Sequence, residues 1–141
     1  MSLPDALQLN IVSPDRRVVS EQVSEVELPG TEGYLGILPG HTPLMTELAV
    51  GQLSYRKGQE RFYLFIGAGM AEVLPDRVTV LARVAERAEE IDMARAETSR
   101  KRAESHLKGP TTQEADLQRA RMAMLTSLTR LQVAERARTR R

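Results

Sequence analysis

The residues best suited to chemistry lie in a short polar segment, Ile91-Asp92-Met-Ala-Arg95-Ala96, which is followed by Arg102. If the segment is helical, Arg95 and Arg102 share a face and lie roughly 10 Å apart along the axis. Two arginines at that spacing could bracket a polyphosphate, with Asp92 beside them. Spacing alone favours a simpler interpretation, an Asp92–Arg95 ion pair on the helix surface that contributes about 0.2 to 0.5 kcal/mol.

Three further groups could take part in chemistry, and each has a plainer structural explanation. Glu89, Glu90 and Asp92 could ligate Mg²⁺, but acids before a helix usually complement its dipole. Gly67-Ala-Gly69 could cradle a phosphate, yet glycines between strands more often permit a bulge or a close backbone contact. We expect His41 to be a hydrogen-bonded loop histidine rather than a ligand or a base. The sequence therefore predicts no metal site.

The sequence lacks the motifs of common enzymes. It has no nucleophile elbow, no Walker phosphate loop, and no histidine in a recognisable triad or metal spacing. The 141 residues include no cysteine, which excludes disulfides, thiol catalysis and thiolate metal sites. Two histidines are too few for a multi-histidine zinc site. We predict a protein that is not an enzyme.

The first 84 residues or so have the pattern of short β-strands. Apolar and polar residues alternate from Leu7 to about Val84, with turn residues at short intervals, as in a sandwich or barrel. Leu53 to Ile66 reads as a hairpin that turns near Gly58. Because apolar side chains fall on both faces of its second strand, we expect that strand to be buried on two sides.

The composition changes after Ala85 to alanine, glutamate and arginine with helical spacing. Asp92 can N-cap a first helix, which Gly109-Pro110 ends. Thr111 to Glu114 reads as a capping box for a second helix that runs to about Arg136. The two helices are predicted to form an antiparallel hairpin.

The second predicted helix has more apolar residues than one narrow stripe can use. Met122, Leu125 and Val133 project away from that stripe. The simpler interpretation is that they pack on the β-domain, and the alternative is a docking face for a partner or for a second conformation of the hairpin. The stripe itself is expected to comprise Leu117, Ala120, Met124, Leu128 and Leu131.

The overall charge of +1 conceals an asymmetry. Residues 1–85 have seven Lys and Arg against ten Asp and Glu, a net −3, whereas residues 86–141 have thirteen against nine, a net +4. All seven cations in the last 31 residues are arginine. Such a tail could attract nucleic acid, an acidic membrane surface or an acidic protein surface. No window approaches the ~20 apolar residues of a membrane span, and no signal peptide is evident.

The stretch from Gly33 to Leu44 has more backbone constraints than a simple turn needs. Its three glycines can adopt positive φ or let another backbone approach, and its two prolines fix φ. Position by position, it resembles the Gly-x-Leu-Gly-Ile-x-Pro-Gly-His-x-Pro-Leu signature of the epsilon subunits of F-type ATP synthases, which are called delta in mitochondria. The constrained residues are Gly33, Gly36, Pro39, Gly40 and Pro43.

Three further segments extend this resemblance over essentially the whole chain. They are Gly67–Val73, Val78–Ala82 and Leu131–Glu135, in the same order as in that family. The resemblance implies an all-β sandwich of about ten short strands followed by an antiparallel α-helical hairpin, with domains at residues 1–86 and 87–141.

The resemblance also implies a non-catalytic subunit of the central stalk of a proton-translocating ATP synthase. Its β-domain would bind the gamma subunit and the proteolipid c-ring, and its hairpin would inhibit ATP hydrolysis by meeting the alpha and beta subunits of the catalytic head. The protein would meet the membrane only through the complex, at the cytoplasmic face of a bacterial inner membrane, since no transit peptide is evident. The implied contact residues are Tyr34, Gly36, Pro39, Gly40, His41, Pro43, Arg119 and Arg130, with Arg121 a weaker candidate.

Arg119 and Arg130, eleven residues apart, are expected to lie nearly in line on the face away from the stripe. Some bacterial members of the family also bind regulatory ATP through an Ile/Leu-Asp-x-x-Arg-Ala motif. One arginine of their second helix is replaced here by Thr126, so we expect weak or absent ATP binding, and no cofactor is required. The matching residues are Ile91, Asp92, Arg95, Ala96, Arg102 and Arg130.

Two alternatives of another class remain at this stage. The arginine-rich last helix could belong to a free-standing nucleic-acid-binding module, or the chain could sense nucleotides without the synthase. Against nucleic acid, the five aromatic residues all lie within residues 34–65, so no base-stacking side chain accompanies the arginines. We therefore expect no nucleic-acid partner.

Overall fold

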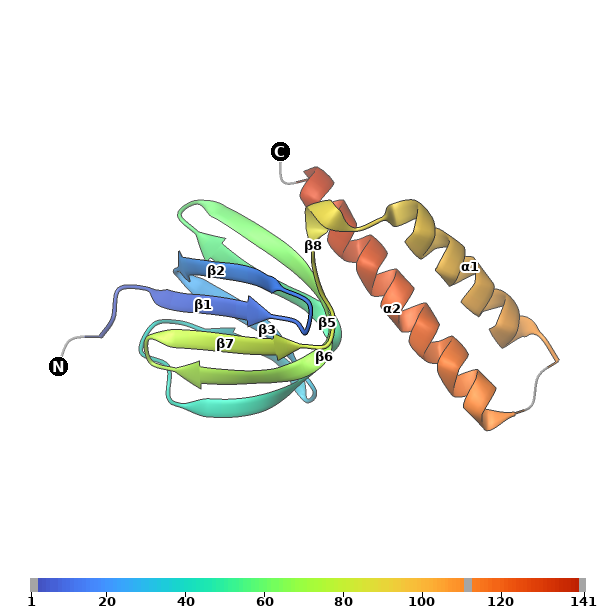
Figure 1. Cartoon of the computed structure of the whole chain (residues 1–141), viewed down its shortest axis with the longest axis horizontal. Helices are drawn as coiled ribbons and strands as arrows, with labels where there is room; N and C mark the ends of the chain where they lie inside the picture. The colour runs from blue at the N-terminus through green and yellow to red at the C-terminus, as the bar shows by residue number, and fades with distance from the viewer. Residues whose placement is uncertain (1–2, 111–112, 140–141) are drawn as a thin grey trace.

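A computed structural model of the chain describes residues 3–110 and 113–139. An N-terminal β-sandwich is followed by α1 (Met93–Lys108) and α2 (Glu114–Thr139), which lie side by side as an antiparallel hairpin (Figure 1). The second helix, α2, contacts β5 and β6. The predicted fold class, an all-β sandwich followed by a helical hairpin, is confirmed.

Eight strands form the sandwich within the described residues, where about ten were expected. The number is smaller because β5 and β6 run without a break over 14 and 15 residues. Hydrogen bonds join the strands in the order β2-β1-β7-β6-β5-β3-β4, β8 pairs with β6, and β1 and β7 are parallel. The bounds are β1 Leu7–Val12, β2 Arg17–Val23, β3 Glu25–Gly30, β4 Gly33–Ile37, β5 Leu44–Lys57, β6 Glu60–Leu74, β7 Arg77–Ala82 and β8 Ala85–Arg87.

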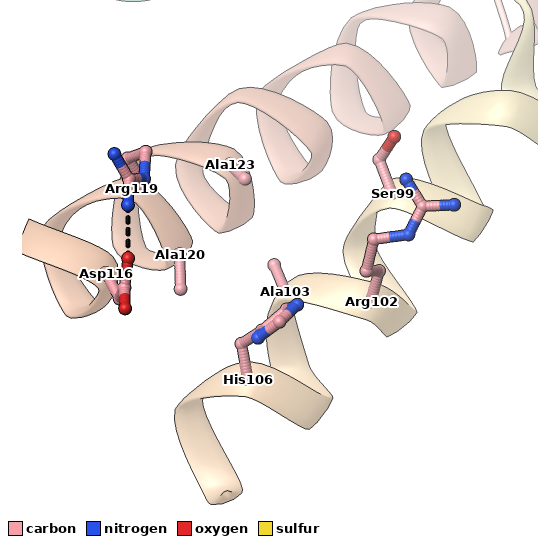
Figure 2. Close-up of a pocket in the computed structure, with 8 residues that line it drawn as sticks. All are labelled: Ser99, Arg102, Ala103, His106, Asp116, Arg119, Ala120 and Ala123. Atoms are coloured by element: carbon pink, nitrogen blue, oxygen red, sulfur yellow. Dashed lines mark hydrogen bonds and ion pairs between the residues drawn. The ribbon is translucent and has the colours of Figure 1, made fainter. Parts of the chain in front are cut away.

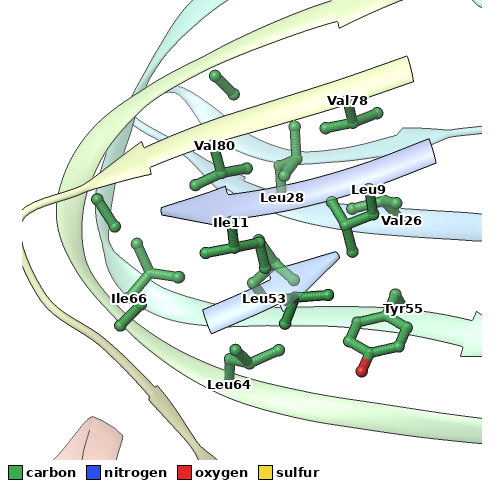
Figure 3. Close-up of a cluster of buried hydrophobic side chains, with 14 of the residues drawn as sticks. Leu9, Ile11, Val26, Leu28, Leu53, Tyr55, Leu64, Ile66, Val78 and Val80 are labelled. Carbon is green, nitrogen blue, oxygen red and sulfur yellow. The ribbon is translucent and has the colours of Figure 1, made fainter. Parts of the chain in front are cut away.

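The sandwich core consists of alternate side chains from nearly every strand (Figure 3). Because successive side chains in a strand point to opposite faces, one face of each strand supplies the core. Removing these side chains from water is the main favourable contribution to folding of the domain. The labelled core residues are Leu9, Ile11, Val26, Leu28, Leu53, Tyr55, Leu64, Ile66, Val78 and Val80, all of them fully buried.

Strand β6 changes partner at its glycines. Its first part pairs with β8 and its second part, from Gly69, pairs with β7. Ala68 has a φ of 76° and Gly69 a φ of 154°, and a Cβ added to Gly69 would lie 2.1 Å from the carbonyl oxygen of Leu81. Only glycine tolerates that approach. The Gly67–Gly69 segment therefore serves a close backbone contact, as its simpler interpretation predicted.

The β5–β6 hairpin turns where the sequence predicted. Lys57 pairs with Glu60 across a two-residue loop, and Gly58 at its first position has a φ of 66°, as a type II′ turn requires. Downstream, Leu64 faces the sandwich core while Phe65, 1% exposed, faces α2. The expectation that β6 is buried on both faces is confirmed.

Local signals set the ends of α1. The Asp92 carboxylate accepts a hydrogen bond from the backbone N–H of Arg95, which satisfies one of the free donors of the first turn. Gly109, after the last turn, is extended with a φ of −78° rather than left-handed, because the residue before a proline avoids helical geometry. Of the predicted capping box, Thr111 and Thr112 lie outside the described residues.

The two helices meet along a seam of small residues spaced seven apart. A seven-residue spacing keeps one edge of each helix facing its neighbour, and small side chains allow close approach. The predicted stripe on α2 was wrong at Leu128, which is 48% exposed, because the alanines of α1 leave no space for a larger side chain in the seam. The seam residues are Ala96 and Ala103 on α1, and Ala120 and Ser127 on α2.

The apolar residues of α2 outside the predicted stripe differ in how far they are buried. Val133, 0% exposed, packs with Ala134 against Phe65 and Ala88, so it joins the helix to the sandwich as predicted. Met122 and Leu125 are 53% and 46% exposed, so the prediction that they pack on the β-domain was wrong. They lie toward the start of α2, away from the end that docks on the sandwich.

Candidate functional site

A pocket of about 430 Å³ lies where β8, the start of α1 and the middle of α2 meet. It brings together four residues of the predicted polyphosphate site: Asp92, Arg95, Ala96 and Arg130. A fifth, Ile91, is buried in the apolar cluster between helix and sandwich. The complete lining is Glu86, Glu90, Asp92, Arg95, Ala96, Ser99 and Arg130.

Asp92 and Arg95 do not form the predicted surface ion pair within the described part of the chain. The Asp92 carboxylate instead accepts from the backbone N–H of Arg95 at 3.0 Å, as the N-cap of α1. This bond occupies one oxygen of Asp92 and leaves the Arg95 guanidinium exposed at the pocket wall. The motif therefore has a structural role in starting the helix, whether or not it also binds a ligand.

Arg130 is held against the sandwich. Its Nε donates to Oε1 of Glu86 at 2.7 Å, and its guanidinium lies 4.5 Å from the centroid of the Phe65 ring. Both ionic side chains are less than a third exposed. A cation over an aromatic face and a charge-assisted hydrogen bond both stabilise this position. The prediction that Arg130 lies on an outward face was wrong, because the side chain extends toward β6 and β8.

Glu90 is also paired, and not with a residue nearby in sequence. Its carboxylate accepts from both terminal nitrogens of Arg16, at 2.8 and 3.0 Å, and from the backbone N–H of Arg87. The Arg16 guanidinium holds the pKa of Glu90 below its ordinary value. Two of the three acids considered as Mg²⁺ ligands therefore have other partners: Glu90 pairs with Arg16, and Asp92 caps α1. Within residues 3–110 and 113–139, no group of three or more such side chains could hold a metal ion.

The formal charge of the pocket is −1. Its carboxylates are those of Glu86, Glu90 and Asp92, and its cations are Arg95 and Arg130. Arg16, which pairs with Glu90 from outside the lining, offsets one of these charges and brings the balance to zero, so a polyphosphate would meet no net positive charge in the pocket. The geometry therefore suits a weak anion site rather than a strong one.

The remaining residue of the predicted polyphosphate site, Arg102, lies elsewhere. Arg102 is two turns beyond Arg95 and lines a different pocket, between α1 and α2 (Figure 2). Thr126, where a second arginine would stand, is half-buried on α2. Of the three arginines proposed for the site, Arg95 and Arg130 line the junction pocket, whereas Arg102 lines the pocket between the helices.

The Gly33–Leu44 signature forms a strand, a turn and an extended segment. The Leu38 carbonyl accepts from the backbone N–H of His41 at 3.1 Å, with Pro39 and Gly40 between them. Gly40 has a φ of 88°, so this is a type II turn, for which proline and glycine in these positions are ideal. The backbone N–H of Gly40 donates to Pro75, which ties the turn to the β6–β7 loop.

Three further residues of the signature lie outside this turn's backbone requirements: Gly36, His41 and Pro43. Gly36 has neither a positive φ nor any atom within 4 Å of an added Cβ, so the expected backbone need for glycine is not found there. His41 donates from Nδ1 to the carbonyl oxygen of Thr42 at 2.7 Å, as the loop interpretation predicted. Pro43 leads directly into β5 and is exposed.

Large apolar side chains gather beside this signature at the surface. Tyr34 and Leu38 are each 56% exposed and Met45 is 66% exposed. The hydroxyl of Tyr34 accepts from the backbone N–H of Gln52, which orients the ring. Between the β3–β4 hairpin and the start of β5 lies a groove of about 510 Å³ that Tyr34 and Met45 line. Exposed apolar side chains grouped on neighbouring strands and a turn are typical of a protein-contact surface.

The other arginines of α2 are more accessible than Arg130. Arg119 is 76% exposed and pairs with Asp116, one turn before it, and Arg121 is 57% exposed and lies 3.5 Å from Glu114. Arg119 is also one of the residues that line the pocket between the helices. Arg136 lies over the Tyr63 ring, 5.4 Å from its centroid.

Sequence reasoning missed Arg16, Glu86 and Phe65 as parts of this site. Arg16 and Glu90 are 74 residues apart, and Arg130 and Glu86 are 44 residues apart. No periodic pattern links positions at such separations. The one available signal was the apolar residues on both faces of β6, which indicated that something covers Phe65.

Comparison with known proteins agrees with this architecture. Residues 6–88 match the family model of the ATP synthase delta/epsilon chain beta-sandwich domain, and residues 89–135 match the model of its long alpha-helix domain. The chain belongs to the ATP synthase delta/epsilon chain family. It is 45% identical over 134 residues to the ATP synthase epsilon chain of Syntrophobacter fumaroxidans, covering 95% of this chain and 99% of the relative. It is 52% identical over 105 residues to that of Koribacter versatilis, covering 74% of each.

Solved structures share the fold of this epsilon-type chain. One is a chain in the Euglena gracilis mitochondrial ATP synthase structure of OSCP, F1 and c-ring, with a TM-score of 0.81 and 23% identity, covering 92% of this chain and 81% of that one. Another is in the central stalk and c-ring structure of Tetrahymena thermophila, with a TM-score of 0.60 and 14% identity, covering 95% and 99%. None of the helices described here is long and apolar enough to span a membrane.

Proposed function

We propose that this chain is a non-catalytic subunit of the central stalk of a proton-translocating ATP synthase, and that its hairpin regulates ATP hydrolysis. The β-sandwich, residues 1–86, binds the gamma subunit and the c-ring. The hairpin, residues 87–141, inhibits hydrolysis when it leaves the sandwich and meets the alpha and beta subunits. Family membership supports the stalk role, and the docked position of Arg130 supports the regulation.

The surface beside the Gly33–Leu44 signature is the proposed stalk contact. Its exposed apolar side chains, Tyr34, Leu38 and Met45, would lose contact with water on binding. Tyr34 and Met45 lie in the strands β4 and β5 and Leu38 begins the type II turn, so the backbone of all three is ordered and little conformational entropy is lost on association. The complex then lies at the cytoplasmic face of a bacterial membrane, which the chain meets through its partners.

The docked hairpin is the proposed non-inhibiting state. In this state Arg130 is engaged by Glu86 and Phe65 and cannot reach an acidic partner. Arg119 is more exposed but pairs with Asp116. Release of α2 from the sandwich would free Arg130 for an acidic segment of the catalytic head, so docking and inhibition compete for one side chain.

A truncation tests whether the hairpin is regulatory. The hydrolysis rate of a catalytic head of alpha, beta and gamma subunits is measured with the full chain and with a chain that stops after Ala88. Faster hydrolysis with the shorter chain, while both remain bound to gamma, is the expected result. Equal rates with both bound would contradict the regulatory role, and failure of both to bind would contradict the stalk role.

A second candidate function is weak, regulatory binding of ATP in the pocket at the hairpin junction. The observation that favours it is the convergence of Asp92, Arg95, Ala96 and Arg130 on one pocket. The lack of net positive charge there and the threonine at position 126 predict weak binding. Calorimetry at millimolar ATP should show heat that Arg95→Ala removes. No heat, or unchanged heat in that variant, would contradict ATP binding at this site.

A further inference from the structure

The last strand of the sandwich, β8, presents the carboxylate that holds α2. It comprises three residues and pairs with β6 over all of them. So short a strand forms few backbone hydrogen bonds, and its position depends on side-chain contacts as well. Whatever fixes β8 therefore also fixes the carboxylate of Glu86, to which Arg130 donates at 2.7 Å.

Arg87 is the residue of β8 that reaches into the sandwich. Successive side chains of a strand point to opposite faces, so Arg87 leaves β8 on the side away from Glu86 and α2. Its Nη1 donates to the hydroxyl of Tyr55 at 3.3 Å, and its Nη2 donates to the carbonyl oxygen of Val18 at 3.0 Å. Tyr55 belongs to β5 and Val18 to β2. One guanidinium therefore ties β8 to two other strands.

The hydroxyl of Tyr55 extends this contact to a carboxylate. Tyr55 is fully buried in the core (Figure 3), and its hydroxyl donates to Oε2 of Glu21 at 3.1 Å while it accepts from Arg87. Burial raises the pKa of Tyr55, so the hydroxyl keeps the proton that it donates. Positive Arg87 and negative Glu21 are thus joined through one neutral side chain. A polar network whose members are all paired makes a rigid arrangement.

We propose that Arg87 is a positioning residue of the hairpin junction, which holds β8 so that the carboxylate of Glu86 lies where Arg130 can donate to it. Arg87 itself donates to β2 and β5, and its influence on α2 passes through Glu86. A guanidinium suits this task, because its rigid fork directs two donors at two separate acceptors. The effect on docking follows from these contacts, whereas any effect on ATP hydrolysis rests on the proposed function.

Amide hydrogen exchange of the full chain tests this role, with the second half of α2 as the reporter. Arg87→Met keeps an unbranched side chain but removes both donors. It should accelerate exchange in α2 by about threefold, less than Glu86→Gln does, because the ion pair is displaced rather than removed. In a chain that already carries Glu86→Gln, Arg87→Met should add no acceleration, because the contact through which it acts is gone.

Tyr55→Phe is a milder second variant, which removes one acceptor of Arg87 and preserves the packing of the ring. It should accelerate exchange in α2 by about twofold, and this effect should also vanish in the Glu86→Gln chain. Because the ring stays in place, this variant decides the question even if Arg87→Met does not fold.

Arg61→Met is the matched control. The Arg61 side chain is 30% exposed, donates to Oγ of Ser54 and lies 3.3 Å from Glu25, so its contacts join β6 to β5 and β3 rather than to β8. It should leave exchange in α2 unchanged.

Four results would overturn the proposal. Neither Arg87→Met nor Tyr55→Phe accelerates exchange in α2, or both accelerate it as much in the Glu86→Gln chain as in the wild type. Arg61→Met has the same effect as Arg87→Met, or β5 is accelerated as much as α2. All four concern docking in the isolated chain, so they are independent of the hydrolysis assays that test the proposed function.

Discussion

Arg130 and Glu86 are 44 residues apart in the sequence, and their ion pair closes the junction between α2 and the sandwich. The 2.7 Å bond from Nε to Oε1 fixes the guanidinium over Phe65, at 4.5 Å from the ring centroid. The same arginine is the one that we propose acts on the catalytic head. Under that proposal, docking and inhibition compete for this one side chain.

Weakening this contact should loosen the hairpin without unfolding the sandwich. Glu86→Gln removes the carboxylate while keeping the shape of the side chain, and should lower the free energy of local opening by about 1 kcal/mol. Hydrogen exchange of the second half of α2 would then be roughly fivefold faster. Core strands such as β5 should exchange as in the wild type, and equal acceleration in both regions would contradict a local role.

Val133 should be the apolar anchor of α2. Val133→Ala removes buried methyl groups at a position that is 0% exposed, so we expect a loss of about 2 kcal/mol in the stability of the docked hairpin. Met122→Ala on the same helix is the control, because Met122 is 53% exposed and should change stability by less than about 0.5 kcal/mol. Thermal unfolding followed by helical circular dichroism measures both. Similar losses in the two variants would contradict docking through the end of α2.

Gly69 should be irreplaceable for the fold, whereas Gly36 should not. Gly69→Ala places a methyl group against the Leu81 carbonyl and in a backbone conformation that alanine avoids, with an expected loss of at least about 2 kcal/mol. Gly36→Ala projects into open space at an ordinary φ and should stay within about 0.5 kcal/mol of the wild type. Urea unfolding monitored by tyrosine fluorescence tests the pair. A tolerated Gly69→Ala would show that β6 can change partner without this contact.

The Arg16–Glu90 pair should make stability depend on pH. Because Arg16 lowers the pKa of Glu90 in the folded state, the pair stabilises the protein above the ordinary value of 4.5 and ceases to do so as the pH falls through the folded pKa. Arg16→Gln should therefore lower the melting temperature at pH 7, and this effect should shrink as the pH falls below 4.5. A difference that does not change with pH over this range would mean that Arg16 acts through packing rather than charge.

Features encoded by neighbouring residues could be predicted from the sequence. The alternation in the first 84 residues, the turn at Gly58 and the cap at Asp92 depend on local geometry, and all three are found in the structure. Local geometry could not predict which face of α2 packs against α1. Small residues such as Ala120 and Ser127 determine the seam by allowing close approach, whereas counting apolar side chains favoured Leu128.

The candidate site was also predictable only in part, because some of its contacts are made between residues distant in sequence. The Ile91–Ala96 motif and Arg130 were identifiable as a set, and they converge on one pocket apart from Ile91. Glu86, the partner of Arg130, comes from β8, and Arg16, the partner of the pocket residue Glu90, comes from the β1–β2 loop, so both contacts depend on the tertiary fold. Arg102 was grouped with the motif by its helical spacing, but two turns along α1 place it in the next cleft.

The most direct test of the account is the rate of ATP hydrolysis by a catalytic head of alpha, beta and gamma subunits bound to the wild-type chain, Glu86→Gln or Arg130→Gln. Glu86→Gln frees Arg130 and should inhibit more strongly than the wild type, whereas Arg130→Gln loosens the same junction but removes the inhibitory charge and should inhibit less. Opposite changes in the two variants are the predicted result. Changes in the same direction, with gamma binding intact, would contradict competition between docking and inhibition for Arg130.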